Sequence, residues 1–497
     1  MFQTRIKQAA LTLLALSALL RIIVFLQNRT LFLDEANLSR NIVEKSYGAL
    51  FGALDYEQFA PPMYTVLVKF FVSLGGVNEY SLRFFALLMG FGALYFFYRL
   101  AQKMFSGPGI LYAIALFGFS IYMMRYQTEN KQYAGDVFFT ILFLFSAWHY
   151  RFHSIKDYFL LGIAGAIAVW FSMPIVFSLA AVGAYLCWEN LLKAKSQQTK
   201  PEVLTRLSLT AALWLISFGI LFFTNLKTSI DSQYLKDFHK WHYLKLPYTL
   251  SHIKMNISVF NGFLEAMIGP DAWVRRWTVI CILLGSWRLY KIDKGKFILI
   301  LGPIITCFVA SMLGQYVLLP RISLFMMPIF MLLIGLGADV LYGKIMLWNN
   351  KLKYGVAALM LIPIVLSLKS ETGIPFFVNE YTIATSRSTL QQISEHPERE
   401  RPLFVVHIAQ PTYLFYTQLY DQRIDIPSST LEYGVWNSDF TKLAPVWKKK
   451  GFEKVWIYDS HTFGKKLKKL KQQVAAIGET EVLIEGEFGA GYLVRLK

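Results

Sequence analysis

A series of long apolar segments, running from residue 8 to residue 368 and then stopping, constrains this chain more than any other feature. A helix needs about 20 predominantly apolar residues to cross the hydrocarbon core of a bilayer, and most of these segments reach or approach that length. With 55% hydrophobic and only 16% charged residues, the chain also carries more apolar surface than a water-soluble fold could bury. The sequence therefore predicts an α-helical polytopic membrane protein.

We predict about eleven membrane-spanning helices. The first follows Arg5 and Lys7 without a convincing small-residue cleavage site, so we expect an uncleaved helix. Ser172 and Pro174 interrupt one continuous apolar run and mark either a tight hairpin or a broken helix. The predicted spans are residues 8–26, 81–98, 110–124, 134–149, 158–170, 173–188, 208–224, 276–289, 297–313, 322–342 and 355–368.

Lysine and arginine residues gather in alternate short loops and so indicate the orientation of the chain. Because positive charge is retained on the cytoplasmic side, these loops predict an N-terminus in the cytoplasm. The protein is then expected in the cytoplasmic (inner) membrane, with its C-terminal tail on the extracytoplasmic, periplasmic side. The other loops expected on that side are residues 27–80, 125–133 and 225–275 and the short loop around Arg321.

The net charge of +18 does not indicate a nucleic-acid partner, because of where the charge lies. Residues 369–497 hold 17 Lys and Arg against 15 Asp and Glu, so residues 1–368 hold the other 33 and 17. Nearly all of the excess therefore belongs to the membrane region, where it is explained by topology and by contact with anionic membrane lipids.

The tail is predicted to be a small, separate α/β domain, so that residues 1–368 form the membrane domain and residues 369–497 the tail domain. Residues 402–408 and 454–458 are short β-branched and aromatic runs, and residues 465–477 have a helical pattern with Leu467 and Leu470 on the buried side. Further strands are expected at residues 482–485 and 491–496. Strands that alternate with helices indicate a partly parallel sheet.

Two adjacent carboxylates, Asp34 and Glu35, lie just beyond the first apolar segment. Carboxylate side chains cannot reach far toward the lipid headgroups. Two adjacent carboxylates also repel each other, so such a pair is expected where it has a functional role. Such a pair suits a general base beside an orienting acid, or a cation site. The sequence leaves open whether a divalent cation is required.

Further charged residues are predicted on the same side of the membrane. A polyprenyl-phosphate sugar needs basic groups for its phosphate and a base for the acceptor hydroxyl, and this side supplies both kinds. For a single basic residue, extension into the headgroup region is an equally good interpretation. The residues concerned are Arg83, Arg125, Glu129, Lys131 and Arg321.

Several motifs in the membrane region resemble those of the C-type glycosyltransferases, and within them family 39, which includes the protein O-mannosyltransferases and the lipid A aminoarabinose transferases. The resemblance covers roughly residues 8–342 and does not extend into the tail. It rests on F-L-D-E-A (residues 32–36), Q-F-A-P-P-M-Y (58–64), N-E-Y-S-L-R-F (78–84), Y-Q-T-E-N-K-Q-Y-A-G-D-V (126–137), W-F-S-M-P-I-V-F (170–177) and L-P-R-I-S-L-F-M-M-P (319–328).

This resemblance implies an inverting glycosyltransferase that uses an undecaprenyl- or dolichyl-phosphate sugar as donor and a lipid, glycan or protein as acceptor. Asp34 would be the general base and Glu35 the acid that accompanies it. The motifs also imply a supporting acid at Glu129 and donor-phosphate contacts from Arg83, Arg125, Lys131 and Arg321. Phe59 and Ala60 stand where the aminoarabinose branch commonly has a basic residue, so this chain lacks the side chain on which that branch's phosphate contact from this loop depends.

Other interpretations remain open at this point. A transporter or flippase for a lipid-linked glycan would also need outward-facing charges, although the sequence shows no internal hydropathy repeat. A scaffold whose tail binds a partner is a third reading. His239 and His242 have a spacing that could share a metal ion, but no third ligand follows at a suitable distance. Tyr126 and Tyr133 are expected to belong to an interfacial aromatic belt.

Overall fold

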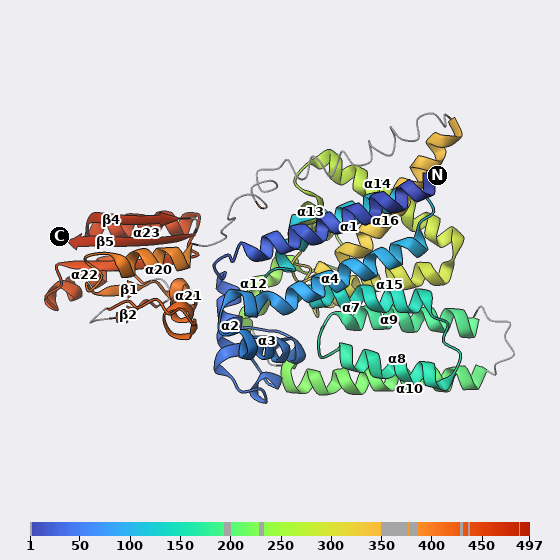
Figure 1. Cartoon of the computed structure of the whole chain (residues 1–497), viewed down its shortest axis with the longest axis horizontal. Coiled ribbons are helices and arrows are strands. Elements are labelled where there is room, and N and C mark those ends of the chain that lie inside the picture. Colours follow the sequence, from blue (N-terminus) through green and yellow to red (C-terminus); the bar gives the residue numbers. More distant parts are fainter. Residues whose placement is uncertain are drawn as a thin grey trace.

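In a computed structural model, a large helical body and a smaller C-terminal sheet domain lie side by side along the long axis of the molecule (Figure 1). The structure describes residues 2–192, 200–227, 233–348, 376, 385–427, 431–435, 438–486 and 488–497. The helical body contains α1 (Phe2–Leu26), α2 (Leu33–Glu44), α3 (Pro62–Gly75), α4 (Glu79–Met104), α5 (Gly109–Phe119), α6 (Ile121–Tyr126), α7 (Tyr133–His149), α8 (Ile155–Ala168), α9 (Ile175–Cys187), α10 (Lys200–Leu221), α12 (Gln233–His239), α13 (Leu250–Ile268), α14 (Ala272–Ile292), α15 (Lys294–Met312) and α16 (Met327–Trp348).

Helix α16 forms the centre of the helical body, and nearly all of its apolar residues are buried beneath α14 and α5. The contact with α14 is close: a Cβ atom on Gly337 would lie 2.0 Å from the carbonyl oxygen of Cys281, and one on Gly285 2.0 Å from that of Leu333. Small residues allow helix backbones in a membrane to approach in this way. The loop that leads into the buried helix α16 carries Arg321.

Six helices among the described residues are long and apolar enough to cross a membrane, and they coincide with six of the predicted spans. The predicted spans at 110–124, 134–149, 158–170 and 276–289 are helical but are shorter, broken or less apolar. The span predicted at 355–368 lies outside the described residues, so the number eleven is not confirmed. The six helices are Gln3–Leu26, Glu79–Met104, Ile175–Leu192, Lys200–Leu226, Lys294–Met312 and Leu324–Leu347.

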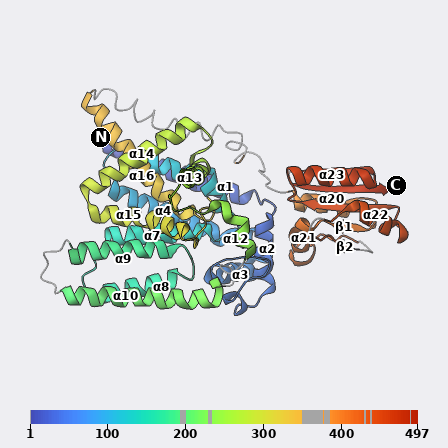
Figure 2. The ribbon, with the colours of Figure 1, turned by 180° about the vertical axis from the view of Figure 1, so that it is seen from behind.

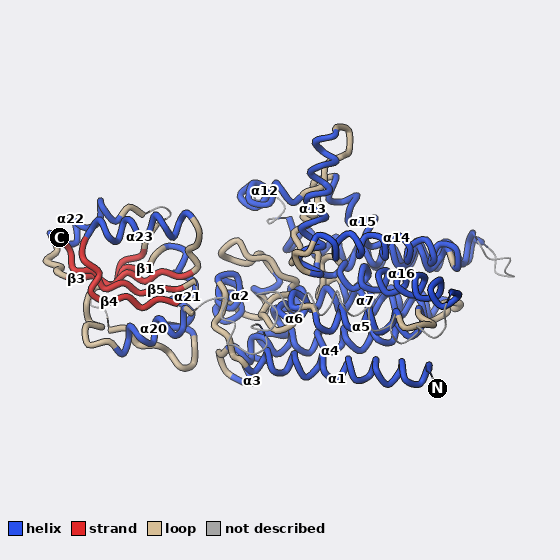
Figure 3. The backbone as a smooth tube through the Cα atoms, turned by 90° about the horizontal axis from the view of Figure 1, so that it is seen from above, coloured by secondary structure: helices blue, strands red, loops and turns tan. Residues whose placement is uncertain are grey.

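The predicted outer loops contain more helix than their composition indicates. Loop 27–80 holds α2 and α3, and loop 225–275 holds α12 and the 19-residue helix α13. Thr249 caps α13 by accepting a hydrogen bond from the backbone N–H of His252. Both α12 and α13 project from the helical body (Figure 3). Helix α13 is amphipathic and carries Lys254 and Glu265, so a search for continuous apolar runs misses it.

The tail domain is a five-stranded sheet with helices packed on it, as seen from behind in Figure 2. The strand order is β2-β1-β3-β5-β4; β1 runs parallel to β2 and β3, and β5 runs antiparallel to β3 and β4. This confirms the predicted partly parallel α/β fold. Its elements are α20 (Ser386–Glu395), β1 (Leu403–Val405), α21 (Gln410–Leu414), β2 (Leu431–Tyr433), α22 (Phe440–Lys449), β3 (Lys454–Ser460), α23 (Lys465–Ile477), β4 (Gly478–Gly486) and β5 (Gly489–Leu496).

The helix predicted at residues 465–477 is observed as α23, with Leu470 buried and Leu467 half-buried. The domain boundary predicted between residues 368 and 369 lies outside the described residues. The tail domain contacts α2 directly, through α21 and the π-helical turn Phe415–Leu419 that follows it. These contacts involve the helix that carries Asp34, so the tail domain packs directly beside the acidic pair.

A reporter fusion tests the predicted orientation. Because the cytoplasmic loops are basic, alkaline phosphatase fused after Lys497 should be active, whereas a fusion after Tyr150, in a predicted cytoplasmic loop, should be inactive. Phosphatase activity is measured in intact cells that express equal amounts of the two fusions. An inactive Lys497 fusion together with an active Tyr150 fusion would show that the orientation is inverted.

Candidate active site

The first turn of α2 presents the acidic pair. Glu35 is the third helical residue, and its Oε2 accepts a hydrogen bond from the backbone N–H of Phe32 (3.1 Å), which precedes the helix. Negative side chains are stabilised near a helix N-terminus by the helix dipole and by the unpaired N–H groups there. Asp34 and Glu35 therefore share one turn, but their surroundings differ.

The carboxylate of Glu35 is buried and fully paired. It accepts hydrogen bonds from Arg83 Nε (3.0 Å) and Nη2 (2.9 Å), and from the backbone N–H of Asn130 (2.8 Å). Burial by itself raises the pKa of Glu35, but Arg83 and the hydrogen bonds outweigh it, so the pKa lies below the ordinary value. Glu35 is thus a permanent charge that joins α2, α4 and the loop that contains Asn130.

The carboxylate of Asp34 is open to a reactant. One of its oxygens, Oδ2, accepts a hydrogen bond from Arg321 Nη1 (2.8 Å), and the two side chains are 28% and 27% exposed. Burial by itself raises the pKa of Asp34. The positive charges of Lys131 and Arg321 lower it by more, so the net pKa lies below the ordinary value. Asp34 is therefore ionised at neutral pH and has an oxygen, Oδ1, that is not engaged by the described residues.

Lys131 lies beside Asp34 and is held by the loop before α3. Its Nζ donates to Gln58 Oε1 (2.9 Å), and the neighbouring Gln132 donates to the carbonyl oxygen of Phe59 (3.1 Å). Burial lowers the pKa of Lys131, while Asp34 opposes that shift. The predicted outer loops 27–80 and 125–133 and the short loop around Arg321 thus meet at Asp34.

Several polar atoms around Arg321 are buried without a hydrogen-bond partner in the described part of the chain. They include Nε of Arg321 itself and Nδ1 of both His239 and His242. Burial lowers the pKa of His239 to about 4, so its ring is neutral at pH 7. Buried polar groups are normally paired, and such a cluster is expected where a polar ligand enters.

The other predicted site residues are placed differently. The guanidinium of Arg83 donates hydrogen bonds to Glu35 and to the carbonyl oxygens of Arg29 (2.6 Å) and Thr30 (3.4 Å). Arg125 pairs with Glu129 through Nε and Oε1 (2.7 Å), one turn apart. The structure therefore brings Asp34, Lys131 and Arg321 together in one cluster, and arranges the remaining predicted residues as two internal ion pairs.

Two alternatives from the sequence can be compared with the structure. Across the described residues, no group of three or more His, Cys, Asp or Glu side chains is placed to hold a metal ion, so His239 and His242 gain no third ligand there. Tyr126 and Tyr133 are not at an exposed interface: both are buried, and their rings meet edge to face at 5.2 Å. The expectation of an interfacial belt is wrong for these two residues, because they pack under the site.

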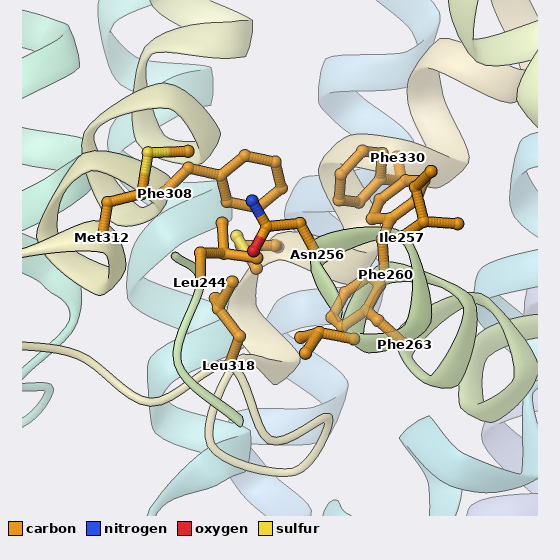
Figure 4. A pocket seen from close by; sticks show the side chains of 11 residues that line it. Leu244, Asn256, Ile257, Phe260, Phe263, Phe308, Met312, Leu318 and Phe330 are labelled. Atoms are coloured by element: carbon orange, nitrogen blue, oxygen red, sulfur yellow. The ribbon is translucent and has the colours of Figure 1, made fainter. Parts of the chain in front are cut away.

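An apolar cavity of about 270 Å³ lies next to the Arg321 loop. Leu318 and Met326, on either side of Arg321 in the chain, both line it, and Figure 4 shows Leu318 among the lining side chains. Aromatic side chains of α13, α15 and α16 point into the cavity, whereas its one amide, Asn256, is paired with the backbone of Lys245. The lining residues are Leu244, Asn256, Ile257, Val259, Phe260, Phe263, Phe308, Met312, Leu318, Met326 and Phe330.

One further residue at the site could not be found from the sequence. His461, from the tail domain, accepts a hydrogen bond from the backbone N–H of Leu33 (3.1 Å), although the two are 428 residues apart. No motif surrounds His461 in the sequence. Only the folded contact between the two domains reveals that it lies beside Asp34.

Comparison with known proteins agrees with this architecture. Residues 60–220 match the family model described as dolichyl-phosphate-mannose-protein mannosyltransferase. No curated protein sequence matches the chain significantly.

Two solved structures illustrate the similarity of fold. ArnT from Cupriavidus metallidurans, bound to undecaprenyl phosphate, is 12% identical, with a TM-score of 0.53 over 97% of both chains. The oligosaccharyltransferase AglB from Archaeoglobus fulgidus, in complex with an inhibitory peptide and a dolichol-phosphate, is also 12% identical, with a TM-score of 0.52 over 97% of this chain and 74% of AglB. The chain thus has the fold of the C-type glycosyltransferases, and the comparisons confirm its resemblance to family 39.

Proposed function

We propose that this protein is an inverting glycosyltransferase that moves a sugar from a polyprenyl-phosphate donor to an acceptor hydroxyl or phosphate at the outer face of the cytoplasmic membrane. The observation that carries the proposal is the ionised, half-open carboxylate of Asp34, which lies 2.8 Å from Arg321 and beside Lys131. The fold of the chain and the family match in residues 60–220 support it.

Asp34 acts as the general base in this proposal. With a hydroxyl acceptor, its carboxylate takes the hydroxyl proton while that oxygen attacks the anomeric carbon of the sugar. The bond from that carbon to the phosphate oxygen breaks, and the electron pair leaves on the polyprenyl phosphate. Attack opposite to the leaving group inverts the anomeric centre. General-base catalysis of this kind contributes about 10²–10⁴-fold to a rate.

Arg321 and Lys131 bind the donor phosphate in this proposal. Their positive charges stabilise the phosphate oxygen as it gains negative charge, and the unpaired Nε of Arg321 is a ready donor for it. Arg83 and Glu35 instead hold the first turn of α2 against α4, and Arg125 and Glu129 brace the loop that carries Lys131. These two ion pairs therefore position the residues of the site and do not contact the substrate.

The apolar cavity fits the lipid part of such a substrate. It is lined almost entirely by apolar side chains and adjoins the loop that bears Arg321. A lipid chain can therefore occupy hydrocarbon surroundings while its phosphate reaches Arg321. We assign the cavity to the isoprenoid chain next to the phosphate.

A transfer assay tests this function. Purified protein in detergent is incubated with undecaprenyl-phosphate mannose or undecaprenyl-phosphate aminoarabinose, labelled in the sugar, and with total envelope lipid as acceptor. We expect labelled sugar on a new product and free undecaprenyl phosphate. The transporter reading instead predicts movement of intact donor across proteoliposomes with no cleavage, and that result would contradict the proposal.

Replacement of Arg321 by alanine should weaken donor binding more than turnover. A hydrogen bond to a charged group contributes about 1.5–3 kcal/mol, so the donor KM should rise about tenfold to 100-fold while kcat falls less. Both constants are measured in the transfer assay. Arg275→Ala is the control, because Arg275 pairs with Glu265 and belongs to neither the cluster nor the cavity. An unchanged donor KM in Arg321→Ala would remove Arg321 from the phosphate site.

A further inference from the structure

We propose that the C-terminal domain completes the active site, with His461 as a positioning residue that holds the first turn of α2, and so Asp34, in its reactive position. This inference rests on the proposed transfer reaction, because it assigns a role beside the proposed base. It gives the tail domain a function in catalysis that does not depend on recognition of the acceptor.

The contact lies at the first helical residue of α2. The backbone N–H of Leu33 has no acceptor within its own helix, as for any residue in a first turn. Nε2 of His461 accepts that hydrogen bond at 3.1 Å, and the His461 ring meets the ring of Phe32 edge to face at 4.8 Å. A side chain from another domain therefore caps the helix immediately before Asp34.

The orientation of the His461 ring is fixed from its other side. Its Nδ1 lies 2.5 Å from Ser460 Oγ, which in turn lies 2.5 Å from Ser386 Oγ. Because Nε2 accepts a hydrogen bond from the backbone N–H of Leu33, Nδ1 must carry the ring proton, and its N–H donates a hydrogen bond toward Ser460. Burial lowers the pKa of His461 to about 4, so this neutral form is the one present at pH 7.

The backbone of His461 is also in an unusual conformation. Its φ angle is +67°, which non-glycine residues seldom adopt, although His is among those enriched there. The conformation is secured by the backbone N–H of His461, which donates to the carbonyl oxygen of Phe488 (2.7 Å), and by nearly complete burial of the side chain. Strained backbone of this kind persists where the surroundings hold it, often at functional sites.

Neighbouring contacts hold the rest of this segment to the tail domain. The backbone N–H of Leu31 donates to the hydroxyl of Tyr416 (2.8 Å), which donates to Glu79 Oε1 (3.0 Å). Arg387 pairs with the same carboxylate oxygen at 2.7 Å, and Glu79 is fully buried. Residues 31–34 are thus held between α4 and the tail domain, and apolar side chains of both domains form one core around them.

His461→Gln and His461→Asn separate the effect of the hydrogen bond to Leu33 from the effect of filling the space of the side chain. In histidine, Nε2 is three bonds from Cβ, and so is the acceptor Oε1 of glutamine. Nδ1 is two bonds from Cβ, and so is the donor Nδ2 of asparagine. His461→Gln can therefore still accept from Leu33, whereas His461→Asn can only replace the contact to Ser460. His461→Ala removes both. Of the three variants, only His461→Gln keeps the hydrogen bond from the backbone N–H of Leu33.

The experiment measures kcat and donor KM for these variants in the transfer assay. Because a shift of about 1 Å in a catalytic group can cost about 100-fold, we expect kcat to fall about tenfold to 100-fold in His461→Ala and His461→Asn with donor KM unchanged. His461→Gln should stay within about threefold of wild type. Val474→Ala is the control, since Val474 lies in the separate apolar core formed with α22 and α23; its kcat should equal that of wild type.

Hydrogen–deuterium exchange of the peptide that contains residues 31–37 gives a readout that needs no substrate. We expect faster exchange at this peptide in His461→Ala and His461→Asn, but not in His461→Gln or Val474→Ala. If wild-type protein transfers no sugar, the proposed function fails, while exchange still reports whether His461 holds α2. Unchanged exchange and kcat in His461→Ala, or equal losses in His461→Gln and His461→Asn, would overturn the inference.

Discussion

Asp34→Asn is expected to lower turnover by about 10²–10⁴-fold while leaving the protein folded and inserted. The amide keeps the size of the carboxylate and can still accept from Arg321, but it cannot take the proton of the acceptor. Because the pKa of Asp34 lies below its ordinary value, wild-type Asp34 is already ionised at pH 7, and the loss falls on the catalytic step. Initial rates are measured at saturating donor.

Asp55→Asn is the control for that variant. Asp55 belongs to the same outer loop, but it is more exposed and pairs with Lys45 away from the cluster. It should transfer sugar at the wild-type rate. A well-expressed Asp34→Asn protein with nearly normal turnover would remove Asp34 as the base.

The second large effect is expected on stability, in Arg83→Ala. This change leaves the buried carboxylate of Glu35 without its main partner, since the two side chains are only 4% and 2% exposed. Removing one member of a buried ion pair costs about 3–5 kcal/mol. The yield of folded protein and its melting temperature in detergent should therefore both fall sharply.

Two comparisons show whether burial is the reason. Arg40→Ala removes an ion pair to Glu44 that is partly exposed, so it should cost no more than about 1 kcal/mol. Glu35→Gln should resemble Arg83→Ala, because it leaves the positive charge of the buried Arg83 guanidinium without its carboxylate partner. A stable Arg83→Ala protein whose donor KM is raised would instead assign Arg83 to the donor phosphate.

Much of the fold follows from the sequence because its signals are local. Apolar runs predict α1, α4 and α16, and the β-branched and aromatic runs of the tail predict β3 and β5. The acidic pair could be located because it follows the first apolar run directly. Helix α13 could not be, because its apolar residues lie on one face and charged residues interrupt them.

The site depends more on tertiary contacts. The sequence predicts that Asp34 and Arg321 lie on the same side of the membrane, but which cation meets which carboxylate depends on how the first turn of α2 is turned relative to Arg83 of α4. That orientation directs Glu35 toward Arg83 and leaves Asp34 for Arg321. His461 carries no sequence signal at all, since its role arises only when the tail domain docks on α2.

In the proposed mechanism, Asp34 drives transfer of a sugar from a lipid phosphate. The most direct test of this role is the amount of undecaprenyl phosphate that wild-type and Asp34→Asn proteins, at equal concentration, release from labelled donor in the presence of acceptor. We expect wild-type protein to release one molecule of undecaprenyl phosphate for each sugar transferred, and Asp34→Asn to release almost none. Equal release by both proteins, or intact donor with both, would contradict it.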